Sequence, residues 1–180
     1  AWVSDRLRNA PHEKLDGGPS DNWELGTRDT GAYATMSDVK EYMCWLGKEF
    51  TENNDSREQI KAAGAAIQDY ERKMTDTLLH GLDNLKGLAD FEDVEIIGGL
   101  NNSSREGLVS FRIKDYPSEK IVRYLNHQGI RTHTRKCDHY SENILKPLGW
   151  DDCVRVSICH YNTLSEIKKF LSCIAAFRDK

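Results

Sequence analysis

The sequence predicts an α+β fold in which helices cover one face of a mainly antiparallel sheet. Three observations support this class: some segments repeat apolar residues at helical spacing, others alternate with a period of two, and the connections between them are short. From residue 56 onward the expected order is α-β-β-α-β-β-α. Short links between neighbouring strands favour antiparallel pairing.

Residues 1–34 are expected to form a long loop, because prolines and paired glycines interrupt any helical pattern there. Their aromatic residues Trp2, Trp23 and Tyr33 are of a type that packs against a partner or carries function. A helix is then predicted over 35–50, because its apolar residues recur at steps of three and four. These residues are Met36, Val39, Tyr42, Met43, Leu46 and Phe50.

A second helix is predicted to begin at Ser56, with Gln59 completing a capping box. Its apolar stripe continues to Leu85, which is long for a small domain, so a coiled-coil segment is the alternative. The small residues from Ala62 to Ala66 favour close packing against a sheet instead.

The later elements follow from changes of period and from turn residues. A capping box at Thr163 and Glu166 opens the final helix. In order, we expect a strand at 94–97, a strand at 109–113, a helix from 117 to about 129, a strand at 130–134, a strand at 154–158 and the final helix. We therefore expect residues 51–180 to form one two-layer domain and residues 1–50 to lie outside this domain.

The composition excludes two classes of partner. Lys plus Arg number 25 and Asp plus Glu 29, so the formal net charge is −4, and the charges are dispersed along the chain. Nucleic-acid binding requires a basic face, which this balance does not favour. No apolar run approaches the roughly 18 residues that cross a bilayer, so we expect no membrane span. Five cysteines without a framework spacing favour free thiols and a cytoplasmic protein.

The strand from Cys153 to Ile158 is the most informative segment. Its alternation directs the valines to the core and places Arg155 on the opposite face. An arginine in the middle of an apolar strand requires an anion. Two interpretations remain open: a salt bridge to an acid on a neighbouring strand, or a binding site for the carboxylate of a ligand.

Two other segments could carry chemistry. Cys137 follows Arg135 and Lys136, and neighbouring positive charge favours a nucleophilic thiolate, although a loop cysteine is more often inert. The Gly26-Thr27 turn could grip a phosphate oxygen through backbone N–H groups and a hydroxyl, but two residues make a weak motif. We expect no metal site, because the spacings among cysteines and histidines match no zinc pattern.

Two motifs about 130 residues apart resemble class V aminotransferases and cysteine desulfurases, which are pyridoxal-phosphate enzymes of fold type I. The first is Trp23-Glu24-Leu25-Gly26-Thr27, followed by a helix that ends in Trp45-Leu46-Gly47. The second is Val154-Arg155-Val156-Ser157, followed by Tyr161-Asn162-Thr163 and Glu166. The resemblance covers roughly residues 11–178, is greatest to the cysteine desulfurase-like or isopenicillin-N-epimerase-like branch, and implies the small C-terminal domain of fold type I.

The resemblance also implies roles for four residues. Arg155 would bind the α-carboxylate of an amino-acid substrate, and Gly26 and Thr27 would contact the cofactor phosphate across a homodimer interface. Cys137 falls in the loop that carries the persulfide cysteine of true desulfurases, but one residue nearer to Gly129 than expected. A related C–S lyase, an epimerase or another amino-acid lyase is therefore an equal alternative.

The lysine that holds pyridoxal phosphate in this family lies well before the Gly-Thr segment, and Lys14 is the sole lysine before Gly26 here. Its surroundings do not match the family. The resemblance therefore implies a C-terminal portion of an enzyme, with residues 1–50 completing a large domain and no covalent cofactor on this chain. The alternative is a stand-alone, non-catalytic module for binding or dimerisation.

Overall fold

The computed structural model of the chain describes residues 3–23, 29–100 and 105–178. The chain divides into two units, Ala1–Lys61 and Ala62–Lys180, and each is treated by itself. Within the described residues, no helix is both long and apolar enough to cross a membrane.

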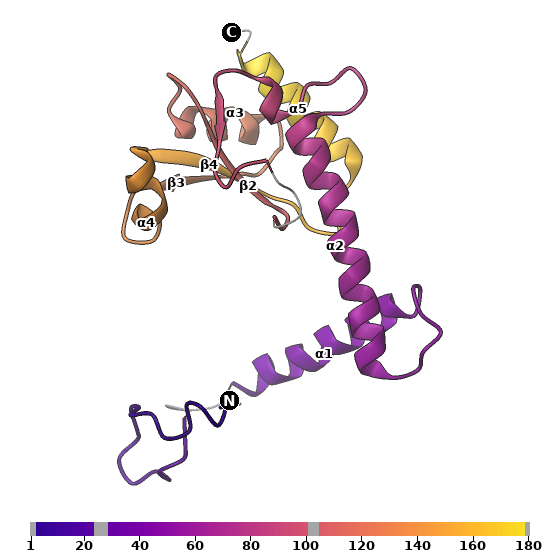
Figure 1. Ribbon diagram of the computed structural model, residues 1–180, viewed down its shortest axis with the longest axis vertical. Coiled ribbons are helices and arrows are strands. Elements are labelled where there is room, and N and C mark those ends of the chain that lie inside the picture. The colour runs from indigo at the N-terminus through magenta and orange to yellow at the C-terminus, as the bar shows by residue number, and fades with distance from the viewer. Residues whose placement is uncertain (1–2, 24–28, 101–104, 179–180) are drawn as a thin grey trace. The chain divides into compact units, whose positions relative to one another are not determined.

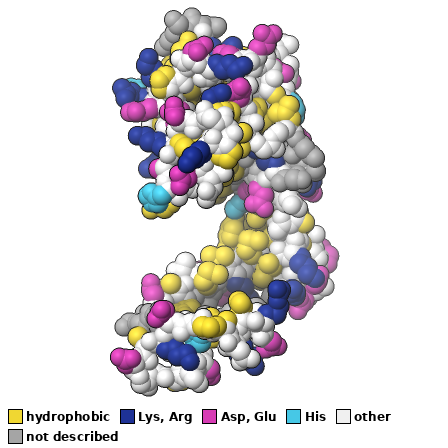
Figure 2. Space-filling view, turned by 60° about the vertical axis from the view of Figure 1, so that its left-hand side comes forward, with side chains coloured by type: hydrophobic (Ala, Val, Ile, Leu, Met, Phe, Trp, Pro, Cys, Tyr) yellow, Lys and Arg dark blue, Asp and Glu magenta, His cyan; other side chains and the backbone are white. Residues whose placement is uncertain are grey.

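The N-terminal unit is built around helix α1, Thr30–Gly47 (Figure 1). The helix begins earlier than the sequence predicts because the Asp29 carboxylate caps it, accepting a hydrogen bond from the backbone N–H of Ala32 at 3.0 Å. Large apolar side chains of this unit are exposed, and Figure 2 shows hydrophobic side chains at its surface. They include Tyr33, Met36, Val39, Tyr42, Trp45 and Phe50.

Helix α2, Ser56–His80, starts where the sequence predicts but is capped differently. The Asp55 carboxylate accepts hydrogen bonds from the backbone N–H groups of Arg57 and Glu58, at 2.9 and 3.2 Å. The predicted capping box of Ser56 and Gln59 is therefore wrong. The Gln59 amide instead donates to the Asn53 carbonyl at 3.0 Å.

The end of α2 also differs from the prediction, because the helix stops at His80 rather than continuing to Leu85. Gly81 adopts φ +79°, a left-handed conformation that favours glycine and ends the helix. Leu82 and Leu85 then exchange two backbone hydrogen bonds, which close a tight turn.

The described residues of the C-terminal unit form a four-stranded sheet in the order β1-β2-β4-β3, with every pair antiparallel. The predicted antiparallel α+β class is thus confirmed. The third strand, however, begins three residues later than predicted. The strands are β1 (Val94–Ile96), β2 (Leu108–Ile113), β3 (His133–Lys136) and β4 (Asp152–Ser157).

The helices of this unit are α3 (Ser118–His127), α4 (Glu142–Leu145) and α5 (Leu164–Arg178), with short 3₁₀ helices at Leu88–Asp90 and Lys146–Leu148. The capping box that opens α5 is confirmed: the Glu166 carboxylate accepts from the Thr163 N–H at 2.6 Å, and the Thr163 hydroxyl accepts from the Glu166 N–H at 3.4 Å. The sequence pattern did not predict α4.

The main core lies between one face of the sheet and helices α2, α3 and α5 (Figure 1). Val154, Val156 and Ile158 point into it, as their alternation predicts. The opposite face carries a smaller cluster of Leu145, Trp150 and Cys153, in which Leu145 comes from α4. This second face, between the sheet and α4, contains the candidate site.

Candidate functional site

A cleft of about 580 Å³ opens on the second face of the sheet. Strands β2, β3 and β4 supply its floor, the segment between β1 and β2 supplies one wall, and α4 with its preceding loop supplies another. The described lining residues are Ile97, Gly98, Arg105, Leu108, Ser110, Arg135, Tyr140, Ser141, Ile144, Leu145, Cys153 and Arg155. The alternation of residues along β4 predicts that Arg155 lies on the face of the sheet opposite the main core, and the cleft opens on that face.

Arg155 is half-buried in the floor of the cleft. Its neighbours across the strands are Ser110 on β2 and His133 on β3, and neither is an acid. Its Nε is buried without a hydrogen-bond partner, and none of the described residues forms an ion pair with it. The described part of the chain therefore gives no support to the salt-bridge interpretation, and an arginine with an unused donor in a cleft fits the carboxylate of a ligand.

Arg105 contributes a second guanidinium, which the sequence analysis did not single out. It donates to the carbonyls of Ile97 at 2.8 Å, Leu108 at 3.2 Å and Gly99. These bonds join the segment that follows β1 to the start of β2. Burial lowers the pKa of Arg105, but a guanidinium remains charged at neutral pH. Arg105 therefore shapes the wall of the cleft and adds positive charge to it.

Cys153 lies in the floor of the cleft beside Arg155 and is 2% exposed. Burial is the largest influence and raises the pKa of its thiol, the charge of Asp152 adds to this rise, and a hydrogen bond with Ser110 and the charges of Arg135 and Arg155 oppose it. The thiol is therefore neutral at physiological pH and behaves as part of a packed surface. Of the five cysteines, Cys153 is the one that lines this cleft.

The predicted site residues are not all brought together. Cys137 is exposed just after β3, where its backbone N–H donates to the Asp151 carbonyl at 2.8 Å. It does not line the cleft, although Tyr140 and Ser141 from the same loop do. Gly26 and Thr27 lie outside the described residues. The proposed roles of these three residues stay predictions.

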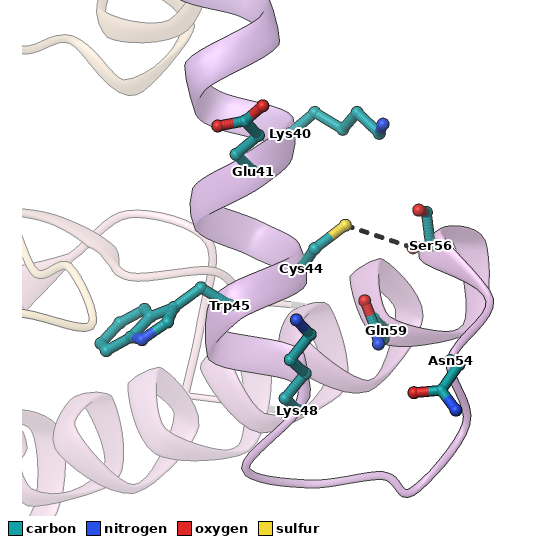
Figure 3. Close-up of a pocket in the computed structure, with 8 residues that line it drawn as sticks. All are labelled: Lys40, Glu41, Cys44, Trp45, Lys48, Asn54, Ser56 and Gln59. Atoms are coloured by element: carbon teal, nitrogen blue, oxygen red, sulfur yellow. Dashed lines mark hydrogen bonds between the residues drawn. The ribbon is translucent and has the colours of Figure 1, made fainter.

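No group of three or more potential metal ligands occurs within the ranges that the structure describes. The N-terminal unit has a smaller hollow of about 360 Å³ beside Cys44, whose thiol donates to the Ser56 carbonyl at 3.7 Å (Figure 3). Figure 3 shows lysines 40 and 48 and Trp45 around it, all exposed. This hollow shows no buried, unpaired polar group among the described residues, so the cleft beside Arg155 is the stronger candidate.

The fold is similar to that of solved cysteine desulfurases. A crystal structure of such an enzyme from Escherichia coli matches 93% of this chain with a TM-score of 0.63 and 17% identity, over 36% of its own length. An apo structure from Thermococcus onnurineus matches 68% of this chain and 28% of its own, with a TM-score of 0.56 and 24% identity. At these identities the likeness defines the fold alone, which is that of fold type I domains.

A sequence model of the family described as aminotransferase class-V matches residues 57–170, which is more than half of the chain. The chain therefore belongs to the class-V aminotransferase family, as its two motifs suggest. This family depends on pyridoxal phosphate. The buried, unpaired Nε of Arg155 is a donor that a carboxylate could use.

Three relatives are named "Probable cysteine desulfurase", and two of them illustrate the match. The protein from Borreliella burgdorferi is 34% identical over 88 residues, covering 48% of this chain and 20% of its own length. The protein from Treponema pallidum is 23% identical over 164 residues, covering 90% of this chain and 32% of its own length. The chain thus spans a third or less of these relatives.

Proposed function

We propose that this chain forms part of a cysteine desulfurase-like pyridoxal-phosphate enzyme that acts on an amino acid, in which Arg155 binds the α-carboxylate of the substrate. The observation that carries this proposal is the half-buried Arg155, with an unpaired Nε and no acid opposite it on either neighbouring strand. Its planar fork of donors suits a carboxylate held by two parallel hydrogen bonds.

The cleft strengthens this interaction. Apolar side chains such as Leu108 and Ile144 lie in its wall and reduce the water around the guanidinium, which increases the attraction between opposite charges. The backbone of β4 holds Arg155 from both sides through its pairing with β2 and β3. When bound, pyridoxal phosphate supplies the aldehyde that captures the amino group and the ring that accepts electrons from the α-carbon. This chain would orient the α-carbon by fixing the carboxylate.

Further assignments belong to the same proposal. Residues 1–50 would complete the large domain, and residues 51–180 would form the small one. Gly26 and Thr27 would contact the cofactor phosphate of a second subunit in a cytoplasmic homodimer. The reaction would be desulfuration, another C–S cleavage or amino transfer. In desulfuration, the Cys137 thiolate would attack the sulfur of the substrate: the C–S bond would break, an S–S bond would form to give a persulfide, and the carbon skeleton would keep the electron pair, gain a proton and leave as alanine.

The test is binding of L-alanine to the whole 180-residue chain, measured by calorimetry. Replacing Arg155 by Gln removes a charge-assisted pair worth about 1.5–3 kcal/mol, so affinity should fall tenfold or more. Arg155→Lys should retain part of the binding, because it keeps the charge but not the fork. Arg123→Gln is the matched control, since Arg123 lies on α3 and pairs with Glu119 outside the cleft. Equal affinity of the Arg155→Gln chain and the unmodified chain would refute the role of Arg155.

A further inference from the structure

The charge of the cleft exceeds what one carboxylate requires. Three of its described lining residues are arginines, at positions 105, 135 and 155. The described lining contains no aspartate or glutamate. Buried or half-buried positive charges without acids nearby are costly unless a ligand supplies the negative charge. The α-carboxylate proposed above accounts for Arg155 alone.

Arg105 is already occupied within the fold, because its two terminal nitrogens donate to three backbone carbonyls. Arg135 has no such partners. It is half-buried on β3, and within the described residues it makes no side-chain hydrogen bond or ion pair. Among the described residues, the guanidinium of Arg135 therefore keeps all its donors available to a second anion, whereas Arg105 keeps only its buried Nε unbonded.

The register places Arg135 close to Arg155 on the same face of the sheet. Arg135 lies directly opposite Cys153, while His133 lies opposite Arg155, so the two arginines are diagonal neighbours on adjacent strands. Diagonal positions of this kind are separated by about 7–8 Å at the backbone, which two long side chains span with ease. A short molecule with an anion at each end can contact both guanidinium groups.

The surface between the two arginines carries no negative charge. Cys153 lies between them on β4, and its buried thiol stays protonated. His133 on β3 completes the group around the two arginines, and Ser110 on β2 lies opposite Arg155 on the other side of β4. None of these neighbours is an acid, and Cys153 is small enough to leave room for a short linker between the two ends of a ligand.

We propose that the substrate is a short acidic amino acid, of the aspartate or glutamate kind, whose α-carboxylate binds Arg155 and whose side-chain carboxylate binds Arg135. This inference rests on the proposed function, because it takes the contact of Arg155 with the α-carboxylate as given. It favours amino transfer over desulfuration, since the thiol of L-cysteine is mostly neutral at pH 7 and leaves Arg135 unpaired.

The test compares L-aspartate with L-alanine in calorimetric titrations of the 180-residue chain. Aspartate should bind at least tenfold more tightly. Arg135→Gln should abolish this preference by weakening aspartate binding far more than alanine binding, and Arg135→Lys should keep part of it, because the charge remains. Arg155→Gln should weaken both ligands. Arg123→Gln removes a positive charge outside the cleft and should change neither the affinity for aspartate nor that for alanine. Circular dichroism checks that each variant is folded.

The outcomes separate the two proposals. Equal affinities for aspartate and alanine, both lowered by Arg155→Gln, would overturn the acidic substrate and leave the proposed function in place. Affinities that do not depend on Arg155 would overturn both. The affinity for inorganic phosphate is measured in the same way. If Arg135→Gln lowers the affinity for phosphate but not the affinity for aspartate, the second anion is a phosphate group and the acidic-substrate inference is wrong.

Discussion

Cys137 and Cys153 belong to the same sheet region but differ in their surroundings. Cys137 follows the last residue of β3 and is exposed, whereas Cys153 is 2% exposed inside β4. Burial raises the pKa of the Cys153 thiol, so less of it is ionised at a given pH. Because the thiolate is the reactive form, burial and protonation both disfavour reaction at Cys153, whereas Cys137 is accessible.

Alkylation should distinguish the two cysteines. With iodoacetamide at pH 7.5, we expect Cys137 to be modified at least about tenfold faster than Cys153, because Cys153 is both inaccessible and protonated. Peptide mass spectrometry at a series of times gives both rates. In guanidinium the two rates should become similar. A folded chain in which Cys153 reacts as fast as Cys137 would contradict the buried position.

The end of α2 shows how neighbouring elements set the length of a helix. Leu82 and Leu85 fit the helical spacing, so the pattern alone extends the helix through them. The chain instead turns at Gly81 and packs tightly against itself. A Cβ on Gly87 would lie 2.3 Å from the Gly81 nitrogen and 2.4 Å from the Leu79 carbonyl oxygen, which leaves room only for glycine.

Gly87→Ala should therefore destabilise the C-terminal unit. Relief of a backbone clash in a packed region costs about 1–3 kcal/mol, which urea denaturation followed by circular dichroism can measure. Gly64→Ala is the control within α2, because a Cβ there meets nothing within 4 Å. Alanine at Gly64 should stabilise the helix by up to about 1 kcal/mol. Equal effects of the two substitutions would show that the turn is not tightly packed.

At the scale of the whole molecule, the C-terminal unit contains its own hydrophobic core. Every buried member of the main cluster lies between Met74 and Ile174. Helix α2 contributes three of them, Met74, Leu78 and Leu79, each at most 3% exposed. The sheet therefore requires the second half of α2, and none of the described residues before α2 belongs to this core.

A fragment of residues 53–180 should fold alone. We expect a single cooperative thermal transition by circular dichroism, because the fragment keeps the whole main core and the Asp55 cap of α2. A fragment of residues 86–180 should show no such transition, since it lacks three core side chains, each of which contributes about 1.5–3 kcal/mol when buried. Cooperative folding of the shorter fragment would show that α2 is dispensable.

The sequence alone was sufficient for the class of fold, for most of its elements and for the side of the sheet on which Arg155 lies. These properties depend on local periodicity, which a strand or helix expresses within a few residues. The two family motifs likewise follow from residue order. They indicate class-V aminotransferases, and the family match over residues 57–170 confirms this.

Only the tertiary structure decided which residues share the cleft with Arg155. Arg105, Arg135 and the loop before α4 are separated from it along the chain and meet it through strand order and register. Periodicity assigns each side chain to one of the two faces of its strand, but it does not identify the strands that pair with it. It therefore could not show that Ser110 and His133, rather than acids, flank Arg155. The unpaired guanidinium on which both proposals rest is a consequence of that pairing, because partners for a half-buried charge come from adjacent strands.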